Sequence, residues 1–344
     1  MDATIATFLI QDGLTNGAIY ALLGLAIVLV FAVTRVIFIP QGEFVAYGAL
    51  TLAILDTGQV PATPKLLLCF GAVAFLLDLW SWRRSFAMRD LVKNIALNLG
   101  LPLAIYGAVL YLAPLQLPSF IRALIAVSII APMGLYVYRI AYRPLADASV
   151  LVLLITSVGV HLAMLGLGLI FFGPEGLRAA PLHDGSFTLG PLLVTAQSVL
   201  IYLMTILIMV GLYFFFEKTL LGKALRATAV NRLGAQLVGV RTQLTGSTAF
   251  VLAATIAAIS GVLLGPITTI YYDTGFLIGL KGFVAAILGG MGSFPITAIA
   301  AIGVGMVESF ASFFASNYKE IIVFGLIVPV LIWLSLGANH HEED

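Results

Sequence analysis

The chain has 344 residues, of which 61% are hydrophobic and only 10% are charged, and its formal net charge is +1. A soluble domain usually carries about 25% charged residues, so this chain has too few to give a core a water-compatible surface. The composition therefore excludes an ordinary soluble protein.

Long apolar runs predict membrane-spanning helices. The clearest runs cover residues 14–34, 150–172, 191–216 and 247–270, and a helix needs roughly 18 or more such residues to cross a bilayer. The runs are continuous, whereas the strands of an outer-membrane barrel alternate apolar and polar residues. We therefore predict an all-α, polytopic bundle of transmembrane helices that forms one domain over residues 1–344.

In chain order, the sequence predicts about eleven membrane segments. They cover residues 14–34, 43–57, 66–81, 95–113, 120–138, 150–172, 192–215, 247–270, 276–291, 294–314 and 320–338. The second and the ninth are short, and each is either a full span or a broken, re-entrant segment packed against protein.

Basic residues in the connecting loops predict the orientation of these segments. Lys and Arg gather in cytoplasmic loops, and 12 of the 17 fall on one side, namely Arg35, Arg83, Arg84, Arg89, Lys93, Arg139, Arg143, Lys218, Lys223, Arg226, Arg232 and Arg241. We expect this side to be the cytoplasm, which places the N-terminus outside and the C-terminus inside.

The long loop on the basic side, residues 216–246, predicts a short amphipathic helix. Apolar side chains recur there every four residues, at Leu221, Leu225, Ala229, Leu233 and Leu237, and Gly239 follows as a stop signal. A basic amphipathic helix lies on an anionic lipid surface or docks on a partner protein. The loop by itself leaves both interpretations open.

Motifs for catalysis and for metal binding are missing from the sequence. Gly222 and Lys223 are followed by Ala224 and lack the upstream glycine of a phosphate-binding loop. We therefore expect no ATP hydrolysis, no cofactor and no metal. Uphill transport by such a chain must draw its energy from an ion gradient or from a partner protein.

Ionisable residues within the predicted segments are functional candidates, because charge in a membrane is costly. They are Glu43, Asp78, His161, Lys281 and Glu308. They form no dense relay, which disfavours a proton-coupled transporter. We interpret Lys281 as snorkelling to the surface and His161 as a packed, hydrogen-bonded histidine. Asp78 is expected to snorkel near Arg83 or to pair with it.

Two of these carboxylates have competing interpretations. Glu43 follows a Pro-Gly break at residues 40–42, where it either caps a helix or lines a substrate path along broken helices. Glu308 either packs a helix interface or lines a pore. A third feature, Gly289, Gly290 and Gly292 ahead of Pro295, predicts a tight turn or a hinge that needs close backbone contact.

Four stretches of the sequence resemble the LivH-type permeases of branched-chain amino acid ABC importers. They are residues 16–22 (NGAIYAL) with 38–44 (FIPQGEF), 142–145 (YRPL) with 154–159 (LITSVG), 222–231 (GKALRATAVN) with 235–240, and 282–293 (GFVAAILGGMGS). Where the family usually has Asn-Phe-Ala-His/Gln-Gly, this chain has Phe-Ile-Pro-Gln-Gly. Residues 60–137 stand as an insertion relative to the family pattern, with two extra spans at 66–81 and 95–113.

The resemblance implies a non-enzymatic permease in a bacterial inner membrane. It implies a second permease subunit, identical or related, together with two cytoplasmic ATP-binding subunits and a periplasmic solute-binding protein. Besides these and membrane lipid, no nucleic-acid partner is expected. Branched-chain amino acids are the default substrate, and other amino acids, amides, urea and sugars stay open. The alternative is an ion-gradient-driven secondary transporter.

The resemblance also assigns residues to two functional regions. Loop 216–246 becomes the element that couples to the ATPase, with candidates Arg226, Ala229, Asn231, Arg232, Gly234, Leu237 and Gly239. The substrate path between the paired subunits has as candidates Asn16, Tyr20, Gln41, Glu43, Thr156 and Glu308, chosen by polarity and predicted depth.

Overall fold

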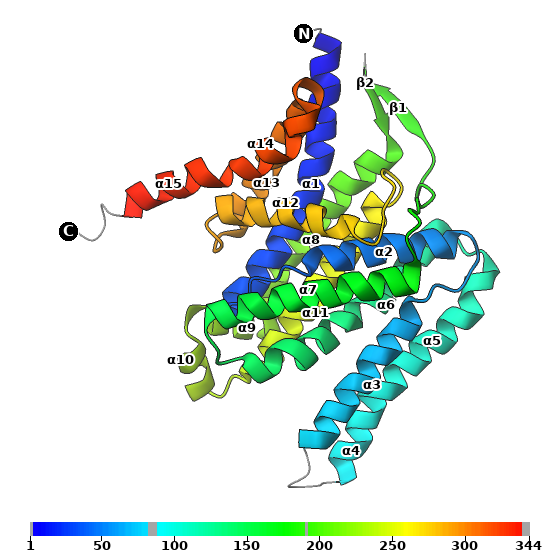
Figure 1. Ribbon diagram of the computed structural model, residues 1–344, viewed down its shortest axis with the longest axis vertical. Helices are drawn as coiled ribbons and strands as arrows, with labels where there is room; N and C mark the ends of the chain where they lie inside the picture. The colour runs from blue at the N-terminus through cyan, green and yellow to red at the C-terminus, as the bar shows by residue number, and fades with distance from the viewer. Residues whose placement is uncertain (1–2, 82–87, 190–191, 339–344) are drawn as a thin grey trace.

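The protein is described here by a computed structural model that covers residues 3–81, 88–189 and 192–338 (Figure 1). Helices make up nearly all of it, and two short strands pair as one antiparallel hairpin with Ser186 opposite Thr195. The predicted all-α transmembrane bundle is confirmed, with the hairpin as an unpredicted addition.

The elements follow one another along the chain as a series of helices interrupted once by the hairpin. They are α1 (Ala3–Thr34), α2 (Gln41–Asp56), α3 (Thr63–Ser81), α4 (Met88–Ile95), η1 (Ala96–Gly100), α5 (Leu101–Leu112), η2 (Ala113–Leu115), α6 (Ser119–Val137), η3 (Tyr138–Tyr142), η4 (Arg143–Leu145), α7 (Val150–Phe172), β1 (Ser186–Leu189), β2 (Leu192–Thr195), α8 (Ala196–Lys218), α9 (Leu220–Val230), α10 (Arg232–Leu237), α11 (Thr242–Leu264), α12 (Thr274–Leu288), α13 (Phe294–Phe314), η5 (Ser316–Tyr318), α14 (Lys319–Gly325) and α15 (Ile327–Ala338).

The predicted count of eleven spans is not confirmed. Among the described residues, 8 helical stretches are long and apolar enough to cross a membrane. The other three predicted segments are α2 with 16 residues, α12 with 15, and a C-terminal segment split into α14 with 7 and α15 with 12. At about 1.5 Å per residue, each falls short of a hydrocarbon core about 30 Å thick.

Several boundaries differ from the sequence prediction. Helix α1 begins at Ala3 and not at residue 14, while α8 begins only at Ala196 because the preceding residues form the hairpin. Helix α11 begins at Thr242 and ends at Leu264, shortly before Pro266, whose ring cannot continue a helix. The spans predicted at 150–172 and 294–314 match α7 and α13.

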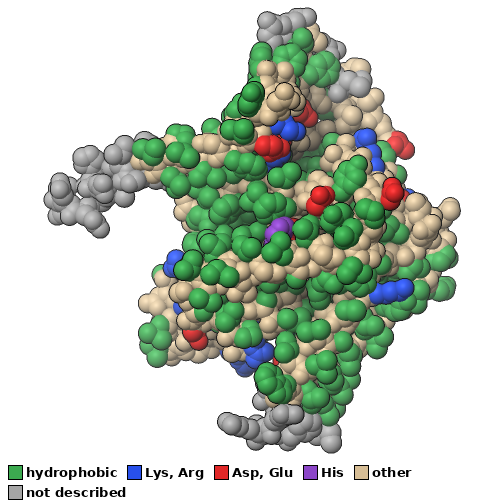
Figure 2. Space-filling view, in the orientation of Figure 1, with side chains coloured by type: hydrophobic (Ala, Val, Ile, Leu, Met, Phe, Trp, Pro, Cys, Tyr) green, Lys and Arg blue, Asp and Glu red, His purple; other side chains and the backbone are tan. Residues whose placement is uncertain are grey.

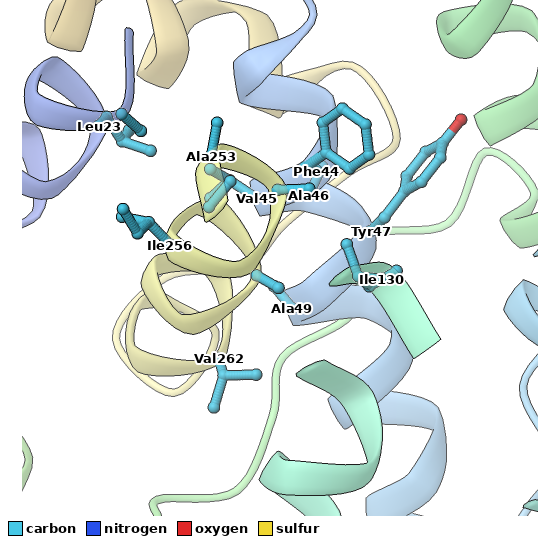
Figure 3. Close-up of a cluster of buried hydrophobic side chains, with 14 of the residues drawn as sticks. Leu23, Phe44, Val45, Ala46, Tyr47, Ala49, Ile130, Ala253, Ile256 and Val262 are labelled. Carbon is cyan, nitrogen blue, oxygen red and sulfur yellow. The ribbon is translucent and has the colours of Figure 1, made fainter. Parts of the chain in front are cut away.

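Helix α2 lies at the centre of the molecule, and nearly all of its residues are buried. Figure 3 shows its Val45 and Ala49 on the side of α11, with Val45 close to Ala253, while Ile256 of α11 points towards Leu23 of α1. The helices approach closely because glycines lie at the contacts. A Cβ on Gly42 would lie 1.9 Å from the Gly275 carbonyl oxygen, and one on Gly261 would lie 2.0 Å from that of Val45. Small residues of this kind drive helix packing in membranes.

Helices α3 to α5, within the stretch interpreted as an insertion, form a hairpin that projects from this core at the lower right of Figure 1. Helix α3 packs on α6, and many outer side chains, such as Leu76 and Tyr111, are exposed. Figure 2 shows hydrophobic side chains over most of this projection, as expected for a surface that faces lipid. The Arg139 guanidinium of η3, directly after α6, holds the projection by contacting Asp78 and the Asn98 side chain, the latter at 2.6 Å.

The connecting loops gather at two opposite ends of the molecule. The start of α1 and the β hairpin lie at the top of Figure 1, whereas α10 and α4 lie towards the bottom. The described parts of loops 173–191 and 216–246 therefore lie at opposite ends, while their assignment to the outside and to the cytoplasm stays a prediction. Two of the basic residues used to predict orientation, Arg83 and Arg84, lie outside the described residues, as does the C-terminal tail 339–344.

Candidate functional site

A buried cluster of charged side chains joins α1, α12, α13 and α14. Glu308 accepts a hydrogen bond from the Tyr20 hydroxyl at 2.5 Å through one carboxylate oxygen and contacts the Lys281 ammonium at 2.5 Å through the other. Lys281 also lies 3.3 Å from Glu320. We call Tyr20, Lys281, Glu308 and Glu320 the lysine cluster.

The lysine cluster corrects the prediction that Lys281 snorkels to the surface. Its side chain is only 8% exposed because two carboxylates surround the ammonium inside the protein. Two carboxylates lie at the Lys281 ammonium, and Glu320 also lies 4.0 Å from the ammonium of Lys319. The Oε2 atom of Glu320 is also buried and has no hydrogen-bond partner among the described atoms.

A second buried pair lies on the opposite face of α12. The Glu43 carboxylate of α2 lies 2.7 Å from His161 Nδ1 of α7, and the imidazole stacks on Phe276 of α12 with ring centroids 4.4 Å apart. The prediction that His161 is packed and hydrogen-bonded is confirmed. Glu43 lies in the first turn of α2, but its Oε1 is directed to His161.

The remaining path candidates lie apart from the lysine cluster. Gln41 is fully buried beside the start of α2 and donates to the Ala253 carbonyl at 2.9 Å. Thr156 is half-buried and donates to the carbonyl of Val152 in its own helix. Asn16 is half-buried on α1, four residues before Tyr20. The structure therefore brings Tyr20 and Glu308 together and places the other four elsewhere.

A cavity of about 650 Å³ opens at the hairpin end of the molecule. Its polar lining includes Asp12 and Thr15 of α1, Arg178, His183 and Gln197. The cavity is large enough to hold an amino acid together with water molecules. A pocket of this size with few convergent polar groups is typical of a small-molecule site. Ser309, the neighbour of Glu308, donates from its hydroxyl to the carbonyl of Leu9, which lines the same cavity, at 2.8 Å.

Asp12 and Glu320 were not predicted as part of a site, and Lys281 was a candidate that was interpreted as snorkelling. Asp12, Asn16 and Tyr20 recur every four residues on α1, so they lie along one face of the helix, and this spacing was a usable signal. The pairing of Lys281 with Glu308 has no local signal, because 27 residues separate them on two different helices.

The loop predicted as one amphipathic helix folds as two. Helix α9 ends at Val230, and Asn231 begins α10 by accepting the Gly234 N–H through its side chain at 2.8 Å. The four-residue leucine repeat therefore crosses a break, so that Leu225 is buried while Leu237 is 81% exposed. Gly239 adopts a φ of +88°, which confirms it as the stop after α10.

The other candidates in this loop divide into anchors and exposed groups. Arg232 donates to the Ala146 carbonyl at 2.6 Å and lies 3.4 Å from Asp147, so it ties α10 to the loop before α7. Arg226 pairs with Glu217 at the surface, and Ala229 is half-buried. The side chains of Val230, Leu233 and Val238 join Leu237 as exposed apolar groups. We call these four residues the α10 patch.

The glycines at 289–292 form the turn between α12 and α13. Gly290 adopts a φ of +73°, and Met291 follows with +57°. A Cβ on Gly289 would lie 2.2 Å from the Thr297 hydroxyl oxygen, so this glycine permits close packing. At Gly292 a Cβ would meet only the Gly290 carbonyl oxygen, at 3.7 Å. The tight turn is confirmed, and α12 accordingly ends at Leu288 and not at residue 291.

Comparison with known proteins identifies the family. Residues 9–331 match the model of the permease component of branched-chain amino acid transport systems. The chain is 32% identical over 237 residues to the high-affinity branched-chain amino acid transport system permease protein BraD of Pseudomonas aeruginosa, covering 66% of this chain and 77% of BraD. With LivH of Escherichia coli K12 it shares 30% over 225 residues, covering 63% and 73%. No solved structure matches significantly.

The chain belongs to this permease family. It is a multi-pass inner-membrane permease subunit of an ABC transport system, and it is not itself the catalytic subunit. The sequence-based identification of a LivH-type permease is confirmed. A permease of this kind works with ATP-binding and substrate-binding partners. The alternative, a secondary transporter driven by an ion gradient, is not favoured.

Proposed function

We propose that this permease moves branched-chain or similar small amino acids into the cytoplasm and that the lysine cluster contacts the amino acid on its way. The observation that carries the proposal is the pair of carboxylates in contact with Lys281, a buried residue of a permease. An α-ammonium group is the part shared by all amino acids, and a second carboxylate beside an already paired lysine is suited to accept it.

The proposed path follows one face of α1. It begins in the cavity beside Asp12, continues past Asn16, and reaches Tyr20 and Glu308 at the lysine cluster. Gln41, Glu43 and Thr156 belong to the same proposal as more remote lining groups on α2 and α7. Gly289, Gly290 and Gly292 are proposed to act as a hinge that lets α13, and Glu308 with it, move during transport.

Leucine uptake into proteoliposomes tests this path. The assembled transporter is supplied with ATP and with the solute-binding protein on opposite sides of the membrane, and Glu308→Gln is compared with wild type. Loss of one charge-assisted hydrogen bond to the substrate is expected to lower the uptake rate about 10- to 100-fold. Lys281 keeps Glu320 as an ion-pair partner in this variant, so the fold is expected to survive.

Glu175→Gln is the matched control, because Glu175 is an exposed carboxylate in the loop 173–191. It should transport leucine at the wild-type rate. If Glu308→Gln also transports at that rate while the complex elutes normally, the lysine cluster is structural and the path proposal is wrong. If Glu308→Gln still takes up urea but no longer takes up leucine, the Glu308 carboxylate recognises the ammonium group of leucine.

We further propose that loop 216–246 couples the permease to its ATP-binding subunits. The α10 patch supports this, because four exposed apolar side chains on a polar loop are typical of a docking surface. In this proposal Asn231 and Gly234 shape the start of α10, Gly239 ends it, and Arg232 holds it on the body of the permease. Arg226 and Ala229 lie beside the contact on α9.

Co-purification with the ATP-binding subunit tests the coupling proposal. Leu237→Ser removes an exposed side chain and should release the ATP-binding subunit without unfolding the permease. Leu220→Ser is the control, since Leu220 is 86% exposed but lies at the start of α9. Equal retention of the partner by wild type and by Leu237→Ser would exclude the α10 patch as the contact.

The proposed assembly contains two permease subunits, two ATP-binding subunits and one periplasmic solute-binding protein. The excess of basic residues at the α10 end supports a cytoplasmic location for that end, with the N-terminus outside. The solute-binding protein would then meet the hairpin end, where the cavity beside Asp12 opens. Cysteine labelling of a Thr188→Cys variant, from outside intact cells, tests this orientation.

A further inference from the structure

A second cavity, of about 740 Å³, lies at the α10 end of the molecule and is separate from the proposed path. Its walls come from three parts of the chain, namely η1 in the projecting hairpin, the end of α6 with η3, and the connection from α10 to α11. It therefore lies where the projection, the core and the proposed coupling loop meet.

The cavity is strongly basic. Arg139, Arg143 and Arg241 all line it. The acidic partner described there is Asp78, which contacts Arg139 and lies 3.9 Å from Arg143. No ion pair joins Arg241 to any residue in the described part of the chain. Among the described ion pairs, three guanidinium groups at the cavity thus face the single carboxylate of Asp78, so its described lining is positively charged.

The backbone adds donors to the same cavity. Helix α11 begins at Thr242, and Arg241 at its N-cap supplies no side-chain hydrogen bond to the first turn. Thr242 and Gln243 line the cavity, so the first N–H groups of a 23-residue helix lie at the arginines. Free N–H groups and guanidinium groups both bind phosphate oxygens.

The remaining walls are apolar. Leu97 and Leu244 are each about 45% exposed and line the cavity together with Leu135. A free phosphate ion has no apolar part that could pack on these leucines, whereas a phospholipid carries acyl chains next to its phosphate. Basic pockets between membrane helices on the cytoplasmic side suit anionic lipid headgroups.

We propose that this cavity binds the headgroup phosphate of an anionic phospholipid between Arg143 and Arg241, with the adjoining acyl chains along Leu97 and Leu244. The bound lipid joins the projecting hairpin to the connection between α10 and α11. It thereby stabilises the position of α10 and gives the projection a role in the assembly. The site does not depend on the proposed substrate path, and only the choice of leaflet rests on the proposed orientation.

Lipid binding to the purified full-length permease tests this proposal. Delipidated protein in a neutral detergent is titrated with fluorescent phosphatidylglycerol, with phosphatidylcholine and inorganic phosphate as competitors. The double variant Arg143→Gln/Arg241→Gln should bind phosphatidylglycerol about 25-fold more weakly, at about fivefold for each basic residue. Arg139 is left in place because it holds Asp78 and Asn98.

Two controls make the result specific. Lys223→Gln removes an exposed basic residue of α9, in the same loop but away from the cavity, and should keep wild-type binding. Leu97→Ser/Leu244→Ser alters the apolar wall alone and should weaken the lipid but not phosphate. A size-exclusion profile that matches wild type shows that each variant is folded.

Three outcomes would overturn the proposal. Inorganic phosphate that competes as well as phosphatidylglycerol would show a site for the free ion. Equal binding by wild type and the double variant would place the lipid elsewhere. Unchanged lipid binding with loss of the ATP-binding subunit in Arg143→Gln/Arg241→Gln would assign the arginines to a partner's acidic side chains. Transport of leucine is measured separately, so that failure here leaves the path proposal intact.

Discussion

Helix α1 and the projecting hairpin α3–α5 are both strongly apolar but have different surroundings. The most apolar window of α1 has a mean hydropathy of 2.4 and is 83% buried inside the protein, whereas that of residues 91–115 has 1.8 and is 17% buried. Both are apolar enough for a membrane. In the core, helices pack closely on one another, and this packing requires small residues at the contacts. In the projection, most side chains are free to contact lipid, and a few polar groups attach the projection to the core.

The glycine contacts of the core provide the sharpest test of this contrast. Gly42→Val places side-chain atoms against the Gly275 carbonyl, where a Cβ already lies 1.9 Å from the oxygen. We expect a loss of more than about 5 kcal/mol and little folded protein. Thermal unfolding followed by fluorescence-detected size exclusion measures the loss.

Gly107→Val is the matched control in the projection. A Cβ on Gly107 meets no atom within 4 Å, so the added side chain should face lipid and leave the unfolding temperature near that of wild type. If the two variants are equally stable, protein packing does not distinguish the two regions.

The lysine cluster gives the next largest effect. Lys281→Met leaves the buried Glu308 carboxylate without its ammonium partner, and this is expected to cost about 3–4 kcal/mol. The double variant Lys281→Met/Glu308→Gln removes both charges and should recover most of the stability. A double variant that is as unstable as the single one would show that the charge on Glu308 is not the cause.

Weakening the ion pairs that attach the projection to the core is expected to destabilise the protein less, and only locally. Asp78→Asn weakens the contact to Arg139, where both side chains are 19% exposed, and the longer contact to the 42% exposed Arg143. It should cost about 1.5 kcal/mol. Hydrogen exchange is the measurement, because the backbone amides of α3 and α5 should exchange faster while those of α2 stay protected. Equal acceleration in both regions would mean that the projection does not open independently.

The surface pair of Glu217 and Arg226 gives the smallest effect. Both side chains are more than one-third exposed, so Glu217→Gln should change the free energy of unfolding by less than about 0.5 kcal/mol. Chemical unfolding in detergent measures it. A larger loss would show that the start of α9 is held more firmly than a solvated loop.

The candidate site could be predicted only in part. Polarity and depth selected Tyr20 and Glu308, which the structure joins at 2.5 Å, and their place on a substrate path stays a proposal. The same criterion selected Thr156, whose hydroxyl bonds its own helix. Asp78 was expected to snorkel near Arg83 or to pair with it, but Arg83 lies outside the described residues. The described ion pairs join Asp78 to Arg139 of η3 and Arg143 of η4. Polarity identifies a group that needs a partner, but the partner depends on which helices are neighbours.

The sequence by itself determined that this chain is a helical membrane protein of the LivH-type permease family. Composition and apolar runs can be read without the tertiary structure, because a helix in lipid forms all of its backbone hydrogen bonds within its own segment. Only the tertiary structure decided that α2 is a buried core helix, that Lys281 pairs with Glu308, and that loop 216–246 breaks at Asn231. Each of these depends on packing, which brings together residues that are far apart in the chain.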